Sequence, residues 1–398
     1  MAKPQIRLKG FRDEWDSLPF SDIVDRVSTS GVSDSATPAV EFEDIISGEG
    51  LLNKDVTKKG IKKSGIAFSI GDILFGKLRP YLKNILLSDF NGIAVGDFWI
   101  LRPRQVNPYL LYNLVGSRHF MQVANISSGS KMPRADWQLV SGTKFNIPHN
   151  TSEQEGIAAY FLSLDELIKA SVQKIDSLKQ MKSASLQFMF PKPGETRPRV
   201  RFNGFNDDWE IKTLNKCLEI SNEKNIDNNY RIEDVLSVSD DYGVINQIQL
   251  LGRSYAGKSV SNYGLLKAGE IVYTKSPLSS KPFGIIKQNF GDTGIVSVLY
   301  AIYRPKNGVS AEFIHYYFDP AWRLNNYLRP LVRKGAKNTM NISDETALTG
   351  TITIPNSFQE QRQIASYFRE LDAQIRLHEQ KLEKLKQIKA SCLDKMFV

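Results

Sequence analysis

The sequence has few of the residues that hold metals or build disulfides. It contains two cysteines, Cys217 and Cys392, and four histidines in 398 residues. Two thiols exclude a disulfide framework and any multi-thiolate metal site, and they fit a reducing compartment. The histidines lie far apart and show no HxH or HExxH spacing. A zinc enzyme is therefore not expected.

Long apolar runs are missing as well. No window of 18 residues is both apolar and uncharged, so the sequence predicts no membrane span. The opening residues, MAKPQIRLKGFRDEW, contain no apolar core of a signal peptide. These absences predict a cytoplasmic protein without a membrane partner.

The overall composition is that of a globular protein with a basic surplus. Hydrophobic residues make up 41% and charged residues 24%, which excludes a mainly disordered chain and a fibre. A length of 398 residues allows two to four domains. Lys and Arg number 52 against 43 Asp and Glu, a net charge of +9. This surplus hints at a polyanionic partner, and its distribution along the chain is the better guide.

The chain contains an internal repeat. The stretch Arg7–Trp15 (RLKGFRDEW) reappears as Arg201–Trp209 (RFNGFNDDW), and Gly71–Lys77 (GDILFGK) is answered by Gly269–Lys275 (GEIVYTK). The Ile-Pro, Glu-Gln, Leu-Asp and Leu-Lys-Gln steps that begin at residue 147 recur 207 residues later. Each half is therefore one unit of about 200 residues, in which a shared scaffold carries a different middle.

Each unit ends in a predicted long helix. Apolar residues recur in steps of three and four over Glu153–Phe190, and more regularly over Phe358–Phe397. Such ladders with charges between the rungs are typical of coiled coils, and about 38 residues span about 57 Å. Pro148 and Pro355 precede the two helices, and Pro191 stops the first. Either ladder alone also fits a helix packed in a globular domain, but their matched lengths favour pairing with each other.

The unit bodies combine both kinds of secondary structure. Short apolar runs at 66–70, 93–95 and 295–299 predict strands, and aromatic and aliphatic residues three or four apart predict helices at 108–120 and 311–327. The fold class is therefore α+β, with two globular bodies, two long coiled-coil helices that pair with each other, and an internal repeat. The expected domains are residues 1–152, 153–190, 191–357 and 358–398.

The basic surplus lies on the two bodies. Residues 1–152 hold 19 basic and 15 acidic residues, and residues 191–357 hold 21 and 17, so each body carries +4. The two helices together carry only +1. Two similarly basic bodies joined by nearly neutral helices suggest that each body contacts a polyanion.

One stretch matches a nucleotide-binding motif. Gly252–Ser259 (GRSYAGKS) has the Walker A pattern, which needs a strand before it and a helix after it. A strand is predicted over Val244–Leu251, but Val260–Gly264 is β-branched residues, Asn and Gly, and predicts no helix. The stretch is better interpreted as a basic, Gly-rich loop that contacts nucleic-acid phosphate, or as a plain surface loop.

Catalytic patterns are otherwise missing from the sequence. Asp319-Pro320-Ala321-Trp322 approaches the [DNS]PP[YFW] motif of amino-methyltransferases but lacks its Pro-Pro pair, and no FxGxG-like loop accompanies it. No local pattern suggests a nucleophilic or nuclease site. The sequence therefore favours a binding protein over an enzyme.

Basic, polar and aromatic side chains gather in loops at matching places of the two units. Lys and Arg supply phosphate contacts, and Arg, Lys, Asn and Ser can also hydrogen-bond base edges. For any single loop the alternative is an ordinary solvated surface. The candidate DNA-binding residues are Lys77, Arg79, Tyr81, Lys83, Asn84, Ser130, Lys131 and Arg134 in the first unit and Arg253, Lys258, Lys275, Lys281, Lys334, Lys337 and Asn338 in the second.

Taken together, the repeated motifs carry a family resemblance. With Arg7–Trp15 and its copy, the stretches GDILFGKLRP at 71–80 and YTKSPLSSKPFG at 273–284 and the repeated helices, the chain resembles a type I restriction–modification specificity subunit, HsdS. The resemblance implies two globular target recognition domains, each reading one half of an asymmetric bipartite DNA site. They would be separated by the two long coiled-coil helices, which pair antiparallel and act as a spacer in an internal pseudo-twofold repeat. The resemblance also implies that this subunit is not catalytic.

The same resemblance implies partners. The helices and nearby surfaces would dock two methyltransferase subunits, which bind S-adenosylmethionine and methylate adenine, and restriction subunits would add ATP-driven translocation and cleavage. S-adenosylmethionine, ATP and Mg²⁺ are expected on those partners and no cofactor on this chain, in a bacterial or archaeal cytoplasm. The alternatives are a coiled-coil protein scaffold that does not read DNA, and a self-contained ATPase or methyltransferase.

The spacer interpretation makes a quantitative prediction. Adding four residues, one helical turn, to one long helix adds about 6 Å, which at about 3.4 Å per base pair should lengthen the nonspecific gap of the DNA site by about one to two base pairs. The measurement is a methylome of cells that carry the lengthened subunit and its partners. An unchanged gap would contradict the spacer role.

Overall fold

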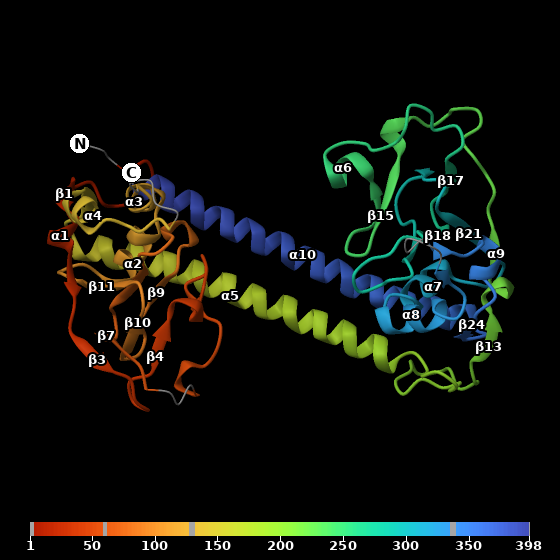
Figure 1. Ribbon diagram of the computed structural model, residues 1–398, viewed down its shortest axis with the longest axis horizontal. Helices are drawn as coiled ribbons and strands as arrows, with labels where there is room; N and C mark the ends of the chain where they lie inside the picture. The colour runs from red at the N-terminus through yellow and green to blue at the C-terminus, as the bar shows by residue number, and fades with distance from the viewer. Residues whose placement is uncertain (1–3, 59–61, 127–131, 335–339, 398) are drawn as a thin grey trace. The chain divides into compact units, whose positions relative to one another are not determined.

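The two apolar ladders form two long helices, α5 (Thr151–Phe188) and α10 (Phe358–Met396), as the sequence predicts. The computed structural model describes residues 4–58, 62–126, 132–334 and 340–397. It divides into two compact units, and each long helix contributes residues to both of them (Figure 1). Unit 1 comprises Met1–Lys174 and His378–Val398, and unit 2 comprises Ile175–Leu377. Each unit therefore contains the start of one long helix and the end of the other.

Unit 1 is built on two four-stranded sheets. One has the order β2-β11-β8-β9 and is antiparallel throughout, and the other has the order β3-β7-β10-β4 with a parallel β10–β4 pair. Strand β1 pairs antiparallel with β12 in a third sheet. The helices and strands of the unit body are β1 (Trp15–Pro19), α1 (Phe20–Ile23), β2 (Val24–Val27), β3 (Ser30–Val32), β4 (Ala39–Glu41), β5 (Ile45–Ile46), β6 (Leu51–Leu52), β7 (Ser64–Phe68), β8 (Ile73–Gly76), β9 (Ile85–Leu87), β10 (Gly92–Val95), β11 (Phe98–Pro103), α2 (Pro108–Gly116), α3 (Arg118–Ala124), α4 (Trp137–Gly142) and β12 (Lys144–Pro148).

Unit 2 repeats the scaffold and changes the rest. Its sheet β14-β21-β18-β19 and its β13–β24 pair correspond to β2-β11-β8-β9 and β1–β12, but two-stranded pairs replace the second four-stranded sheet. The helices and strands of the unit body are β13 (Glu210–Thr213), β14 (Leu218–Ile220), β15 (Leu236–Ser239), β16 (Gly243–Asn246), α6 (Gln247–Leu251), β17 (Gly264–Leu266), β18 (Ile271–Tyr273), β19 (Ile286–Gln288), β20 (Gly294–Val296), β21 (Ala301–Pro305), α7 (Ala311–Tyr317), α8 (Ala321–Leu328), β22 (Arg333–Lys334), β23 (Met340–Asn341), α9 (Asp344–Ala347) and β24 (Thr351–Ile354).

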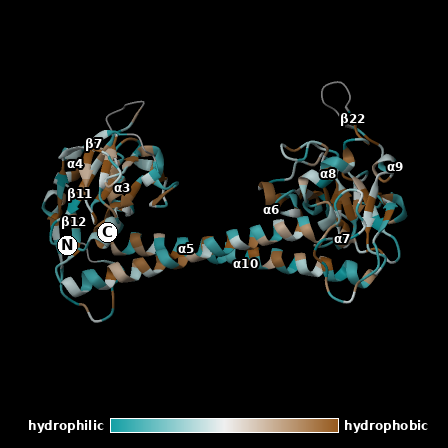
Figure 2. Cartoon of the chain, turned by 90° about the horizontal axis from the view of Figure 1, so that it is seen from below, coloured by the Kyte–Doolittle hydropathy of each residue, from teal (hydrophilic) through white to brown (hydrophobic). Residues whose placement is uncertain are grey.

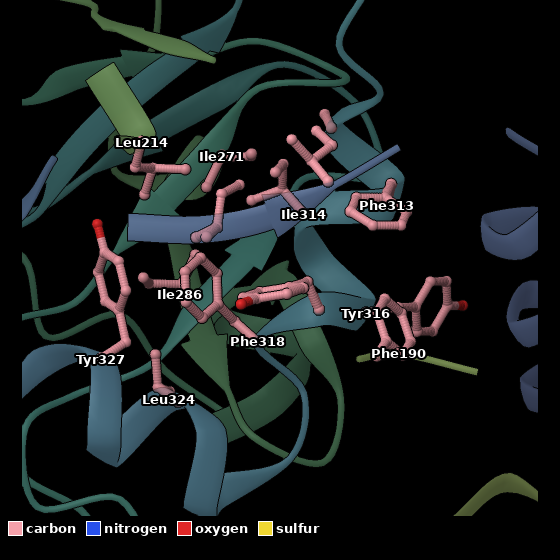
Figure 3. Close-up of a cluster of buried hydrophobic side chains, with 14 of the residues drawn as sticks. Phe190, Leu214, Ile271, Ile286, Phe313, Ile314, Tyr316, Phe318, Leu324 and Tyr327 are labelled. Carbon is pink, nitrogen blue, oxygen red and sulfur yellow. The ribbon is translucent and has the colours of Figure 1, made fainter. Parts of the chain in front are cut away.

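An aromatic cluster fills the core of unit 2. Figure 3 shows Phe190, Phe313 and Tyr316 beside the aliphatic side chains of the sheet, and all three are buried. The rings of Phe190 and Phe313 lie 5.4 Å apart, within the range of favourable aromatic packing. Because Phe190 follows α5 directly, this packing holds the end of the first long helix on the body of unit 2.

Within unit 1 the start of α5 pairs with the end of α10. The ammonium of Lys389 lies 2.5 and 2.8 Å from the carboxylate oxygens of Asp165, and Tyr160 hydrogen-bonds Cys392 at 3.3 Å. The partner number rises as the residue number falls, so the segments run antiparallel. Figure 2 shows hydrophobic and hydrophilic residues alternating along both helices, as the ladders predict.

Within unit 2 the same pairing is made with the roles of the helices exchanged. Lys182 of α5 lies 2.8 Å from Asp372 of α10, and Ser185 hydrogen-bonds Tyr367 at 3.0 Å. Each of these residues lies 207 positions from its counterpart in unit 1. The antiparallel pairing and the internal repeat that the sequence predicts are therefore present in the contacts of each unit.

An Arg–Glu–Trp cluster joins the opening motif of each unit to a long helix. In unit 1 the guanidinium of Arg7 donates to both carboxylate oxygens of Glu153 at 2.6 and 2.7 Å, and the indole N–H of Trp15 donates to the same carboxylate at 3.3 Å. The Glu153 side chain is almost fully buried. A buried carboxylate needs such donors, because isolated burial of its charge is costly.

Unit 2 repeats this cluster almost atom for atom. Arg201 donates to both oxygens of Glu360 at 2.6 and 2.8 Å, and Trp209 donates at 3.2 Å. The repeated motif that identifies the duplication in the sequence is thus the anchor of each unit.

Several boundaries differ from the sequence-based prediction. The helix predicted over 108–120 is two helices, because Ser117 follows α2 and caps α3 with its hydroxyl. The helix predicted over 311–327 is also divided, at Asp319-Pro320, where Pro320 precedes α8 without a side-chain cap. The strand predicted over 244–251 is half wrong. It ends at Asn246, whose side chain accepts two backbone N–H groups and starts α6.

Substituting either glutamate of the Arg–Glu–Trp clusters should destabilise the protein. Glu153→Gln or Glu360→Gln removes the charge that a half-buried arginine faces, at a cost of ~2–4 kcal/mol, below the full cost of breaking a buried pair because the arginine keeps some exposure. Urea unfolding followed by circular dichroism measures it. Glu155→Gln, at an exposed position of α5, is the control and should change the free energy of unfolding by less than ~0.5 kcal/mol.

Candidate nucleic-acid interface

The first predicted basic loop connects two strands of the unit 1 scaffold. Strands β8 and β9 pair antiparallel, and residues 77–84 link them around a short 3-10 turn, Pro80–Leu82. Arg79 and Lys83 flank this turn with φ angles of 49° and 52°, in the left-handed region that non-glycine residues rarely adopt. Both side chains and that of Tyr81 are exposed. The loop therefore presents two cations around one aromatic ring.

A second segment joins this loop. The backbone N–H of Arg79 donates to the carbonyl of Pro133 at 2.8 Å, and Arg134 forms an isolated β-bridge with Leu78. The guanidinium of Arg134 lies 3.0 Å from Asp97, and the ammonium of Lys77 lies 3.5 Å from the same carboxylate. The structure thus brings together Lys77, Arg79 and Arg134, which the sequence placed in separate loops.

Asn84 has a structural position. It is 4% exposed, its amide N–H donates to the carbonyl of Phe42 at 3.1 Å, and its carbonyl accepts the hydroxyl of Ser47 at 2.7 Å. These contacts fix the end of the 77–84 loop. The side chain is enclosed and supports the basic residues beside it.

An open hollow of about 700 Å³ lies next to Lys83. Arg118, Gln122 and Asn125 of the α3 region line it with exposed polar side chains, and Asp394 of α10 closes one side. These three residues are not among the candidates predicted from the sequence. The feature that could have indicated them is Ser117, which caps the start of α3, the helix that carries the exposed Arg118.

In unit 2 the corresponding loop connects β18 and β19, and its two lysines form ion pairs within the unit. Lys275, also left-handed with φ 49°, forms an ion pair with Asp344 at the start of α9. Lys281 is 4% exposed, and its ammonium contacts the carboxylate of Asp240 at 2.5 Å and the carbonyl of Asp319 at 2.9 Å. Lys281 is therefore held inside unit 2.

Lys281 belongs to a buried charge cluster at the α5–α10 pair of unit 2. The carboxylate of Asp319 lies 2.9 Å from the ammonium of Lys287 and 3.0 Å from that of Lys182. Burial alone would raise the pKa of Asp319, but the ammonium groups of Lys287 and Lys182 hold it well below its usual range. Burial, reinforced by Lys287, lowers the pKa of His315 to about 3, so the imidazole is neutral. The cluster fastens both long helices to the unit body.

The Gly252–Ser259 stretch forms a loop after α6. Gly252 caps α6 in the left-handed conformation, Arg253 stacks over the ring of Tyr255 at 4.6 Å, and Lys258 is exposed. The next element of unit 2 after the stretch is the strand β17, not a helix, so no helical amides stand directly behind it to cradle a nucleotide phosphate. The residues present do not fit a nucleotide site, and the stretch is an exposed basic loop.

Some candidates cannot be placed in full. Ser130, Lys131, Lys337 and Asn338 lie outside the described residues. Lys334 belongs to the short strand β22, which pairs with β23, and only its backbone is described.

Other kinds of site are not found in the described residues. No group of three His, Cys, Asp or Glu side chains gathers there as metal ligands. Over the same ranges, none of the helices has the length and apolar character needed to cross a membrane.

Solved structures share this fold. A type I restriction–modification S subunit from M. genitalium matches with a TM-score of 0.62 at 12% identity, covering 100% of this chain and 99% of that one. A chain from work on complex assembly and conformational transition of the type I R–M system matches with a TM-score of 0.52 at 18% identity, covering 97% and 98%. At these identities the likeness concerns the fold.

A family model matches the second half of the chain. Residues 206–387 match the type I restriction modification DNA specificity domain. The matched region contains the body of unit 2 and its share of α10, and unit 1 repeats its scaffold sheet and Arg–Glu–Trp cluster. Residues 206–387 are thus similar to the specificity domain of type I restriction–modification systems, and the solved S subunit shares the fold of the whole chain.

Proposed function

We propose that each unit reads one half of an asymmetric bipartite DNA site. The observation that carries this proposal is a duplicated scaffold with diverged surfaces. The sheet order and the Arg–Glu–Trp cluster are the same in both units, whereas unit 1 adds a four-stranded sheet and unit 2 adds α6 and two-stranded pairs. Equal scaffolds suit binding of the same polymer, and different surfaces suit different base sequences.

The DNA-contacting residues in this proposal are the exposed ones. Arg79, Lys83 and Tyr81 in unit 1, and Arg253 and Lys258 in unit 2, stand free of ionic partners among the described residues. Lys77 and Arg134 both pair with Asp97, and Lys275 pairs with Asp344, so these three residues would attract DNA less strongly. Asn84 and Lys281 are buried and support their loops. Ser130, Lys131, Lys334, Lys337 and Asn338 complete the set on the strength of their sequence positions.

Partner subunits would dock on the long helices. Leu162, Leu167 and Val172 of α5 in unit 1 are between 38% and 45% exposed, and Met181 in unit 2 is 49% exposed. Exposed apolar side chains on a helix suit a protein contact. Two methyltransferase subunits, one for each copy of the helix pairing, would bind S-adenosylmethionine, and restriction subunits would bind ATP and Mg²⁺.

Single-molecule methylation mapping tests the two-half-site proposal. DNA modified by this chain with its methyltransferase partner should carry methyl groups at one bipartite sequence whose halves differ. Methylation at a continuous or palindromic sequence would contradict the proposal. DNA binding without salt dependence, or none at all, would favour the scaffold alternative.

Lys258 and Arg253 should differ in what they contribute to DNA binding. As a phosphate contact, Lys258→Ala should weaken binding to all sequences alike and reduce the slope of log K against log salt concentration by about 0.9. As a base contact, Arg253→Ala should cost about 1–3 kcal/mol on the target and relax one position of the half-site read by unit 2.

Fluorescence anisotropy titrations at several salt concentrations measure both effects. Lys192→Ala, an exposed lysine outside the proposed surface of the same unit, is the control and should leave the slope and the specificity unchanged. An identical response of Lys258→Ala and Lys192→Ala would remove Lys258 from the interface.

A further inference from the structure

Each unit exposes one apolar side chain at the tip of the same scaffold loop. Tyr81 follows Pro80 between β8 and β9 and is 56% exposed. Leu278 follows Pro277 between β18 and β19 and is 41% exposed. These loops come from equivalent strands of the two units, so the arrangement occurs twice although the loop sequences differ. A single exposed apolar side chain is ordinary on a protein surface. Its recurrence at the equivalent loop of both units suggests a shared use.

The backbone holds Tyr81 outward. Arg79 and Lys83, on either side of the 3-10 turn, are both left-handed. The N–H of Lys83 donates to the carbonyl of Pro80 at 2.8 Å, and the N–H of Gly48 donates to the carbonyl of Lys83 at 3.2 Å. Strained non-glycine residues persist only where their surroundings fix them, and they cluster at functional sites. Tyr81 is thus presented by a fixed turn, and no hydrogen bond or ring contact to its side chain is found within the described residues.

The unit 2 loop is fixed by other means. The N–H of Leu278 donates to the carbonyl of Lys281 at 3.1 Å, and so does the N–H of Gly284. The Lys281 ammonium is buried against Asp240 and Asp319. This explains why a lysine is enclosed in a loop that the sequence marks as basic: its charge anchors the turn that exposes Leu278.

The residues around Tyr81 favour DNA over protein as the partner that contacts its ring. The exposed cations Arg79 and Lys83 flank the ring, and Arg118 lies across the hollow beside Lys83. Protein–protein interface cores are depleted of charge, whereas DNA offers phosphates to the cations and base faces to the ring within a few ångströms. Aromatic and aliphatic side chains that enter DNA do so between stacked bases.

We propose that Tyr81 and Leu278 each enter a base-pair step of the half-site read by their own unit and partly unstack it. Arg79 and Lys83 hold the phosphates on either side of the step in the first half-site. The inference rests on the proposed two-half-site function and adds the mode of contact: specificity then depends in part on how easily the step unstacks, in addition to hydrogen bonds at base edges.

The test uses the full chain with its methyltransferase partner and a duplex of the mapped target. 2-Aminopurine, whose fluorescence rises when it loses its stacking neighbours, replaces one base at a time in each half-site. The wild-type complex should show a several-fold rise at one step of each half-site. Tyr81→Ala should abolish the rise in the first half-site alone and weaken binding about tenfold. Leu278→Ser should abolish it in the second alone.

Three variants make the result specific. Tyr81→Phe keeps the ring and should keep the signal. Ile70→Ala, at a position 66% exposed before the other end of β8, should change neither the signal nor the affinity. Thermal unfolding of each variant checks that the fold is retained.

Each remaining outcome decides against the inference. An unchanged fluorescence rise and affinity in Tyr81→Ala would overturn it, as would loss of the methyltransferase partner from the complex with the DNA signal intact, which would make Tyr81 a protein contact. Specific binding by the wild type without any rise would overturn the inference and leave the proposed function standing. Absence of specific wild-type binding would overturn the proposed function itself.

Discussion

The buried carboxylates of Glu153 and Glu360 are the constraint from which each unit is organised. A carboxylate removed from water needs hydrogen-bond donors around it, and here an arginine and a tryptophan from the opening motif provide them. The donors lie between 138 and 159 residues away from their glutamates in sequence. Satisfying one charge therefore fixes the start of a long helix against the first strand of the unit.

The pairing of the long helices explains why unit 1 combines two separate pieces of the chain, residues 1–174 and 378–398, around the continuous piece that forms unit 2. Each unit needs the start of one long helix and the end of the other, because Asp165 pairs with Lys389 in unit 1 and Asp372 pairs with Lys182 in unit 2. The repeated Leu-Asp step supplies the aspartate of each pair. Between the anchors the chain is free to vary, and the second sheet and the loops of the two units differ accordingly.

The ion pairs also explain why the basic residues have different roles. A lysine or arginine neutralises a DNA phosphate best when no carboxylate of the protein already forms an ion pair with it. Arg79, Lys83, Arg253 and Lys258 remain available in this sense within the described chain, whereas Lys281 and Lys287 are occupied by Asp240 and Asp319. The same type of residue thus supports the loop in one place and faces solvent in another.

The sequence by itself determined the repeat and the two long helices, because periodicity, capping and helix propensity are local properties. It placed the basic loops but could not tell Lys281 from Lys258, since the aspartate and the carbonyl that enclose Lys281 lie 41 and 38 residues away. It likewise separated Lys77 from Arg134, which a shared Asp97 brings together. Only the tertiary structure decides which charges meet a partner and which remain exposed, because that choice depends on contacts between segments distant in sequence.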